Sequence, residues 1–165
     1  MFESNLRIYG KHAAILKKYS QDKQAEEQFE FKVLDNDGNS HVIYIFDTMI
    51  QAYMVASMIG IIHNEKIDKD EGKEPTATIF SEVLTTNRKS LQRIVKFMIL
   101  TEKEYDDVDP IIKEAFSINY RENIEKEITS YARYGFEVID NYFKDCVTYE
   151  DVINAIVNFK NDYSI

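Results

Sequence analysis

An almost unbroken apolar run, "TMIQAYMVASMIGIIH" at residues 48–63, sets the plan of this protein. Between Met49 and Ile62 only Gln51 and Ser57 are clearly polar. A helix that is apolar on every side is buried in a protein core or crosses a membrane. A membrane crossing takes about 20 apolar residues, and this run is too short. We therefore predict a central core helix, with Asp47 as its N-cap.

Small residues form a strip along this predicted helix. Ala52, Ala56 and Gly60 recur at every fourth position, so another backbone can approach closely there. A second long helix is predicted over residues 120–143, and Gly135 lies in the middle of its apolar stripe. Glycine costs about 1 kcal/mol relative to alanine inside a helix. We predict that the two helices cross closely within one chain, and a dimer interface is the alternative.

The stretch "VLDNDGNSHVIYIF", residues 33–46, has polar residues spaced like the start of a calcium loop. An EF-hand loop needs glycine at its sixth position and glutamate at its twelfth. Counted from Asp35, Gly38 is fourth and Phe46 is twelfth. The flanking residues alternate or are β-branched, which is typical of strands. We predict an antiparallel β-hairpin near residues 28–46 that turns at Asp35 to Ser40.

The remaining sequence is mainly helical in pattern. The segment from Asn64 to Phe80 and the acidic tract at 101–109 are predicted to be solvated connectors, because neither has apolar periodicity. With 165 residues and 44% hydrophobic residues, we expect one domain over residues 1–165. Its fold class is mainly α (α+β), a helical bundle of about six helices with one hairpin insertion. Further helices are predicted at residues 7–19, 85–100, 109–118 (cap Asp109, then Pro110) and 148–160 (cap Thr148, with Asp151 three residues on).

Residues with obvious site chemistry are sparse. The three histidines, His12, His41 and His63, fall on three different predicted elements, and no pair has metal-ligand spacing. Cys146 is the single cysteine and is interpreted as a small, partly buried hydrophobe. No glycine-rich phosphate loop, serine elbow or zinc-protease motif is present. We predict no catalytic, metal or cofactor residue and a non-enzymatic role, while a carboxylate site assembled only by the fold stays open.

One stretch reverses the general charge of the chain. Arg88, Lys89, Arg93 and Lys96 follow one another without an acid between them, whereas the whole chain has a formal net charge of −9. Residues 89, 93 and 96 align along one face of a helix. The stripe is either an ordinary solvated face or a contact for phosphates or for an acidic partner surface.

Three segments together resemble a known group of proteins. They are "YGKHAAILKKY", "FDTMIQAYMVASMIG" and "YARYGFEVIDNYF", which occur in this order between residues 8 and 145. The pattern resembles small helical proteins associated with bacterial DNA phosphorothioation (Dnd) gene clusters. The resemblance implies a cytoplasmic accessory protein of bacterial DNA modification or phage defence, and it implies no catalytic residue.

Three functions are compatible with the sequence. The first is a non-enzymatic interaction or accessory protein of such a system, with a protein partner and with a homodimer left open. The second is local nucleic-acid binding through the basic helix at 88–96. The third is an acidic inhibitor or nucleic-acid mimic of phage origin, which rests on net charge alone. We expect no membrane association, and a cytoplasmic location because the first residues lack the apolar run of a signal peptide.

Overall fold

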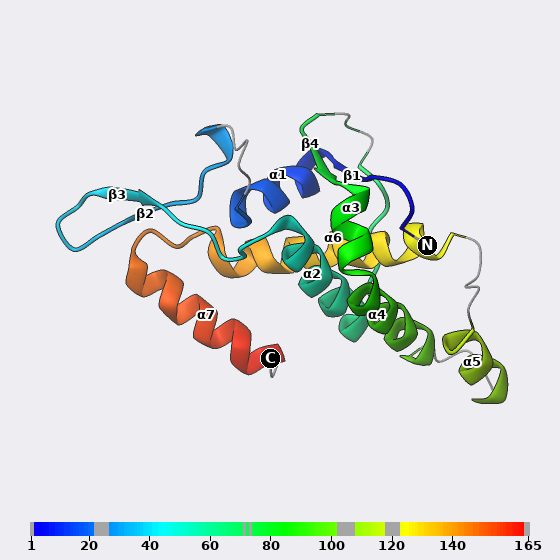
Figure 1. The fold of residues 1–165 in the computed structure, drawn as a ribbon. Helices are drawn as coiled ribbons and strands as arrows, with labels where there is room; N and C mark the ends of the chain where they lie inside the picture. Colours follow the sequence, from blue (N-terminus) through cyan, green and yellow to red (C-terminus); the bar gives the residue numbers. More distant parts are fainter. Residues whose placement is uncertain are drawn as a thin grey trace.

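Two long helices, α2 and α6, pack against each other at the centre of the protein (Figure 1). The computed structural model describes residues 2–21, 27–70, 72, 74–101, 108–117 and 123–163. The strands are β1 (Leu6–Tyr9), β2 (Lys32–Leu34), β3 (Ser40–Val42) and β4 (Thr76–Ile79). The helices are α1 (Gly10–Tyr19), the 3₁₀ turn η1 (Glu27–Phe29), α2 (Met49–His63), α3 (Ser81–Thr86), α4 (Arg88–Thr101), α5 (Val108–Ala115), α6 (Ile124–Phe143) and α7 (Tyr149–Tyr163).

The predicted close crossing lies at the two glycines. A Cβ atom on Gly135 would overlap the backbone carbonyl of Ala56, and a Cβ atom on Gly60 would overlap the carbonyl of Tyr131. Each helix therefore touches the backbone of the other through a residue without a side chain. The prediction of a crossing within one chain is confirmed. It accounts for glycine at two positions where helix propensity disfavours it.

A small sheet that the sequence analysis did not predict joins the N-terminal region to the middle of the chain. β1 pairs antiparallel with β4, with Leu6 opposite Ile79 and Tyr9 opposite Thr76. The expected helix at 7–19 therefore begins only at Gly10, and the expected connector from Asn64 ends in a strand. Both expectations were wrong because these four-residue strands are stabilised by each other rather than by a local pattern.

The β2–β3 hairpin confirms the predicted turn. Asp35 accepts hydrogen bonds from the backbone N–H groups of Asp37 and Asn39 and from the ring of His41, at 2.8–2.9 Å. Its carboxylate thus organises the turn, as Asx turns do. The strands are shorter than expected. The chain leaves β3 after Val42, and the N–H groups of Ile45 and Phe46 donate to Tyr19 at the end of α1.

Helix boundaries follow the sequence with local corrections. Thr48, not Asp47, caps α2, because its hydroxyl accepts from the N–H of Gln51 at 3.3 Å. α5 begins at Val108, one residue before Asp109. Residues 81–84, which no predicted element covers, lie in the short helix α3. Residues 102–107 of the acidic tract lie outside the described residues.

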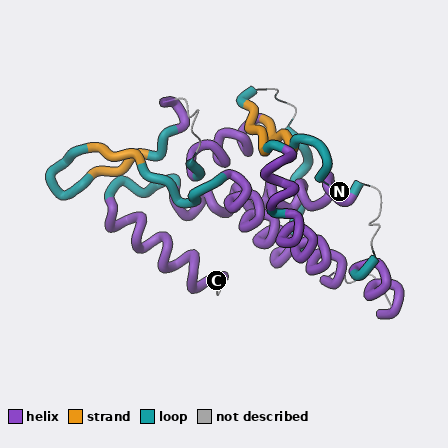
Figure 2. Tube along the Cα trace, in the orientation of Figure 1, coloured by secondary structure: helices purple, strands orange, loops and turns teal. Residues whose placement is uncertain are grey.

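The mainly α class with a hairpin is confirmed, as Figure 2 shows by the predominance of helix over strand. Buried side chains from both sheets and from each of the helices α1 to α7 meet in one hydrophobic core, which includes Tyr53, Phe136 and Phe143. The short helix α3 contributes one of them, Leu84. Among the described residues, each helix is too short or too polar to cross a membrane.

Candidate functional site: an apolar groove beside a basic helix

The outer face of α2 is the floor of an open groove. Although the sequence predicted burial on all sides, Met54, Val55 and Met58 are only partly buried, and Ile62 is 53% exposed. α4 runs along one side of this face and the end of α7 along the other (Figure 1). The groove has a volume of about 280 Å³ and an almost wholly apolar lining. The central helix is therefore uncovered along one stripe.

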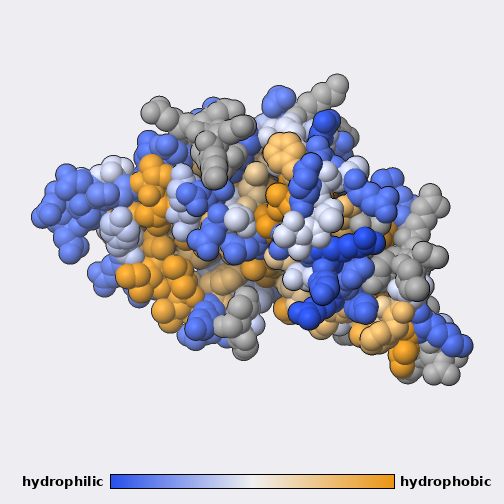
Figure 3. All heavy atoms as spheres, in the orientation of Figure 1, coloured by the Kyte–Doolittle hydropathy of each residue, from blue (hydrophilic) through white to orange (hydrophobic). Residues whose placement is uncertain are grey.

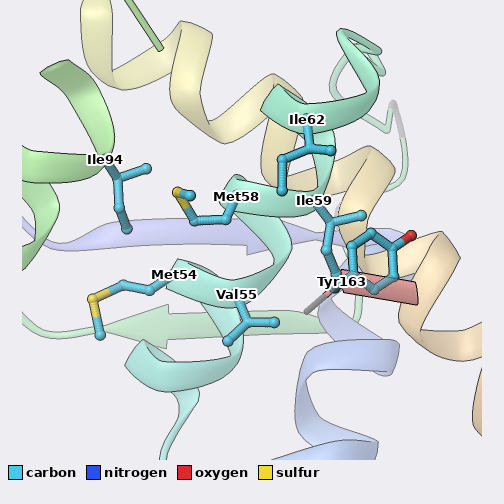
Figure 4. Close-up of a pocket in the computed structure, with 7 residues that line it drawn as sticks. All are labelled: Met54, Val55, Met58, Ile59, Ile62, Ile94 and Tyr163. Atoms are coloured by element: carbon cyan, nitrogen blue, oxygen red, sulfur yellow. The ribbon is translucent and has the colours of Figure 1, made fainter. Parts of the chain in front are cut away.

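The groove walls come from two helices far apart in sequence. Ile94 contributes the α4 wall, and Tyr163 contributes the α7 wall. In Figure 4 the two methionines point away from α2 on the Ile94 side, and Ile59 lies on the Tyr163 side. The hydroxyl of Tyr163 and the ring of His63 are hydrogen-bonded at 2.9 Å, which joins the end of α7 to the end of α2. Methionine side chains adapt readily to different apolar partners.

The basic residues of α4 lie on the outer side of the same wall. Arg88, Lys89 and Arg93 are exposed, and within the described part of the chain they have no ion pair or hydrogen bond from their side chains. Lys96 differs, because it is half-buried and its Nζ lies 4.7 Å from the ring centroid of Phe116. The predicted stripe is thus a free positive surface of three residues, with Lys96 packed at its end. Another face of α4 is apolar and buried, and it consists of Leu91, Ile94, Val95, Met98 and Ile99.

Helix α7 exposes much of its predicted apolar face. Val152 and Ala155 are buried, whereas Ile153, Ile156 and Val157 are 60%, 43% and 50% exposed. All three are apolar residues of the predicted helix at 148–160. Figure 3 shows hydrophobic side chains gathered on the surface over α7 and the base of the hairpin. The protein therefore has a second uncovered apolar surface, which we call the α7 stripe: Ile153, Ile156 and Val157.

A polar cluster between α1 and α6 was missed by the sequence analysis. His12 is buried, and its Nε2 lies 3.0 Å from Glu137, which also pairs with Lys11 at 2.5 Å. Burial lowers the pKa of His12 despite the opposing effect of Glu137. Burial would raise the pKa of Glu137, but its bonds to Lys11 and His12 outweigh this and lower it. No local signal could reveal a pair separated by most of the chain.

This cluster holds α1 against α6. The His12 side chain is buried, and its second ring nitrogen, Nδ1, has no hydrogen-bond partner among the described residues. Next to it, the hydroxyl of Tyr19 donates to Asp140 at 2.7 Å, and Lys18 lies 3.6 Å from the same carboxylate. Each acid in the cluster is thus neutralised by a partner from α1. Glu137 and Asp140 are partly exposed and line an open pocket beside α1, and their carboxylates are bound there by Lys11, Lys18 and Tyr19 of that helix.

The other candidate ligands also have structural partners. His41 is bonded to Asp35 in the hairpin, and His63 to Tyr163. Cys146 is partly buried, as expected, and burial raises the pKa of its thiol. Over the described ranges no three His, Cys, Asp or Glu side chains are grouped to hold a metal ion.

Comparisons with known proteins give no relative. No family model, no curated protein and no solved structure matches this chain. The groove, the α7 stripe and the basic residues of α4 are surfaces of this protein that are open to a partner.

Proposed function

We propose that this chain is a non-enzymatic interaction protein that accepts an amphipathic helix in the groove between α4 and α7. The main support for this proposal is the uncovered face of α2, a core helix with apolar residues on all sides. Helices bind other proteins in this way by placing an apolar stripe into a hydrophobic groove. A bound helix would complete the burial of Met54, Met58 and Ile62.

The charge beside the groove selects the kind of helix. Arg93 precedes the wall residue Ile94, and Arg88 and Lys89 lie one turn or more earlier on α4. They are free positive groups in a chain with a net charge of −9. An acidic flank on the bound helix would be attracted to this rim, and electrostatic complementarity of this kind favours specificity and fast association.

The biological setting of this activity rests on the resemblance of residues 8–145 to Dnd-associated proteins. We propose an accessory role in bacterial DNA modification or phage defence, in the cytoplasm. In that role the groove would hold a helical segment of another protein or of another copy of this chain. No catalytic step is assigned to the protein.

A labelled peptide tests the groove directly. The probe is a fluorescein-labelled helical peptide with leucines at helical spacing and glutamates elsewhere, and the control peptide has lysines in place of the glutamates. We expect fluorescence anisotropy to show saturable binding of the acidic peptide, weaker binding of the basic one, and loss of binding in Met58→Glu. Arg93→Glu should weaken the binding of the acidic peptide and not that of the basic peptide. Equal binding of both peptides by the parent and by Met58→Glu would contradict the proposal.

Local nucleic-acid binding is the second candidate, favoured by the free side chains of Arg88, Lys89 and Arg93. Phosphate contacts by such residues give binding that weakens steeply with salt. Titration with labelled duplex and single-stranded DNA at low salt separates the two candidates. Binding that is lost in Arg93→Glu, Lys96→Glu but kept in Met58→Glu supports nucleic acid. Absence of DNA binding in the parent removes this candidate.

A further inference from the structure

We infer that the helix in the groove is α7 of a second copy, so that two chains form a two-fold dimer by placing α7 of each into the groove of the other. This inference rests on the proposed function, because it requires that the groove accept an acidic amphipathic helix. It names the occupant. Four features of the described residues lead to it: the uncovered floor, the α7 stripe, their matching lengths and their opposite charges.

Helix α7 carries the exposed apolar residues that a helix needs to bind in the groove. Val152 and Ala155 hold α7 to its own chain, while Ile153, Ile156 and Val157 project from the neighbouring side of the helix. Tyr149, 40% exposed, continues the same side toward the start of the helix. Neighbouring exposed apolar residues of this kind form a patch, and such patches mark interaction surfaces. α7 is thus held in place by one face and presents another.

The groove floor and the exposed apolar side of α7 have the same length. The groove floor runs along α2 from Met54 to Ile62, which is eight residue steps or about 12 Å of helix. The exposed apolar side of α7 runs from Tyr149 to Val157, also eight steps and about 12 Å. A helix docked along the floor would therefore cover it from end to end. Neither surface would extend beyond the other.

The helices α4 and α7 differ in the sign of their charge. α4 carries Arg88, Lys89, Arg93 and Lys96 and has no acidic residue, whereas α7 carries Glu150, Asp151 and Asp162 against one lysine. Glu150 lies seven residues before Val157, so it borders the α7 stripe on the helix surface. Docking of α7 would place Glu150 beside the basic wall of the partner groove, whereas Asp151 and Asp162 are bonded to Thr148 and Tyr142 of their own chain. The contact would thus oppose the repulsion expected between two chains of charge −9.

A two-fold dimer would cover the groove and the α7 stripe with a single type of contact. A two-fold interface uses the same surface on both chains, so each groove and each α7 stripe is covered once. One type of contact then buries both the groove floor and the α7 stripe. A helix from an unrelated partner would fill the groove without needing acidic and apolar residues on α7. The composition of α7 therefore favours a second copy.

Sedimentation equilibrium on the full chain tests the inference. We expect a monomer–dimer equilibrium whose dissociation constant rises at least about tenfold in Val157→Glu, since the change buries a charge in an apolar contact. Asn158→Glu adds the same charge on the exposed polar side of α7 and should leave the dimer unchanged. Circular dichroism and thermal melting should show both variants folded. Equal weakening by the two substitutions would overturn the inference.

A mixing experiment separates docking of α7 into the groove from any other dimer. Met58→Glu damages the floor and leaves α7 intact, whereas Val157→Glu damages α7 and leaves the floor intact. Each variant alone should be monomeric. A mixture should form heterodimers, because one intact α7 can still enter one intact groove. Absence of heterodimers in the mixture would overturn the inference.

The proposed function can survive failure of the dimer. If the parent is a monomer at every concentration reached, the second copy is excluded as occupant. Binding of the acidic leucine–glutamate peptide by that monomer would keep the groove as a site for a partner helix. Absence of both dimer and peptide binding would remove the dimer and the proposed function together.

Discussion

Gly135 is where the backbones of the two central helices meet. Gly135→Ala gains about 1 kcal/mol of helix propensity, but its methyl group would overlap the carbonyl of Ala56. A backbone atom cannot turn aside as a side chain can, so α2 and α6 must separate. We expect a net loss of about 2 kcal/mol in unfolding free energy, measured by urea denaturation. Lys126→Ala, exposed on the same helix, is the control and should change stability by less than about 0.5 kcal/mol.

His12 gives the protein a defined response to mild acid. Its pKa in the folded state is lowered from 6.5 by burial, so below that pH the unfolded chain takes up a proton that the folded chain resists. The free energy of unfolding should therefore fall as the pH drops through 6.5. Above that pH the contribution of the neutral His12 to stability should be complete. The charged groups facing the ring are Lys11 on its own helix, Glu137 and Arg133 on α6, and Asp70 in the connecting segment.

The substitution His12→Gln tests this response. Glutamine still offers Glu137 a hydrogen bond but does not titrate, so the loss of unfolding free energy between neutral pH and about pH 5 should be smaller than in the parent. Glu137 has a lowered pKa and contributes at more acidic pH. Above pH 7 the two proteins should have parallel pH profiles. An unchanged slope in the acid range would contradict a histidine that is buried neutral.

At the scale of an element, α7 depends on its cap. The hydroxyl of Thr148 accepts from the N–H of Asp151 at 3.2 Å, and Asp151 accepts in return from the N–H of Thr148 at 2.8 Å. Thr148→Ala should cost about 1 kcal/mol, a usual value for a lost N-cap. Hydrogen exchange should show the first turn of α7 losing protection. Thr85→Ala, at an exposed position in α3, should have little effect on stability, and a comparable loss there would argue against a specific cap.

Elements with a local signal were predicted well. The turn residues from Asp35 to Asn39, the cap at Thr148 and the buried face of α4 depend on neighbours a few residues away, so the sequence alone reveals them. β1 and β4 do not, because each is only four residues long and five other elements separate it from its partner along the chain. For the same reason the pair of His12 and Glu137 was missed.

The candidate site was predicted only in part. The basic residues of α4 were found from their charges, and three of the four are exposed as a binding surface requires. The groove was not found, because amphipathic periodicity shows which residues are apolar and not which of them remain uncovered. Val152 and Ile153 are both apolar residues of α7, yet Val152 is buried and Ile153 is 60% exposed.

For the molecule as a whole, we predict that calcium and zinc leave the melting temperature unchanged. Asp35 already has four hydrogen bonds in the hairpin, and a ligand that binds only the folded state must raise the melting temperature by mass action. Differential scanning fluorimetry with micromolar metal, with EDTA as the reference condition, checks this. A reproducible upward shift would show a site that the hairpin interpretation misses.

The partnership of α2 with α6 has a consequence for how the chain is made. α2 ends at His63 and α6 begins at Ile124, and synthesis proceeds at about 5–20 residues per second. After α2 is complete, on the order of 3 to 12 seconds pass before the ribosome begins to produce α6, the helix that packs on it. During that interval the methionines and isoleucines of α2 are exposed to other nascent chains and to chaperones. Shortening the wait by circular permutation, with α6 placed before α2, should raise the yield of folded protein without changing the finished structure.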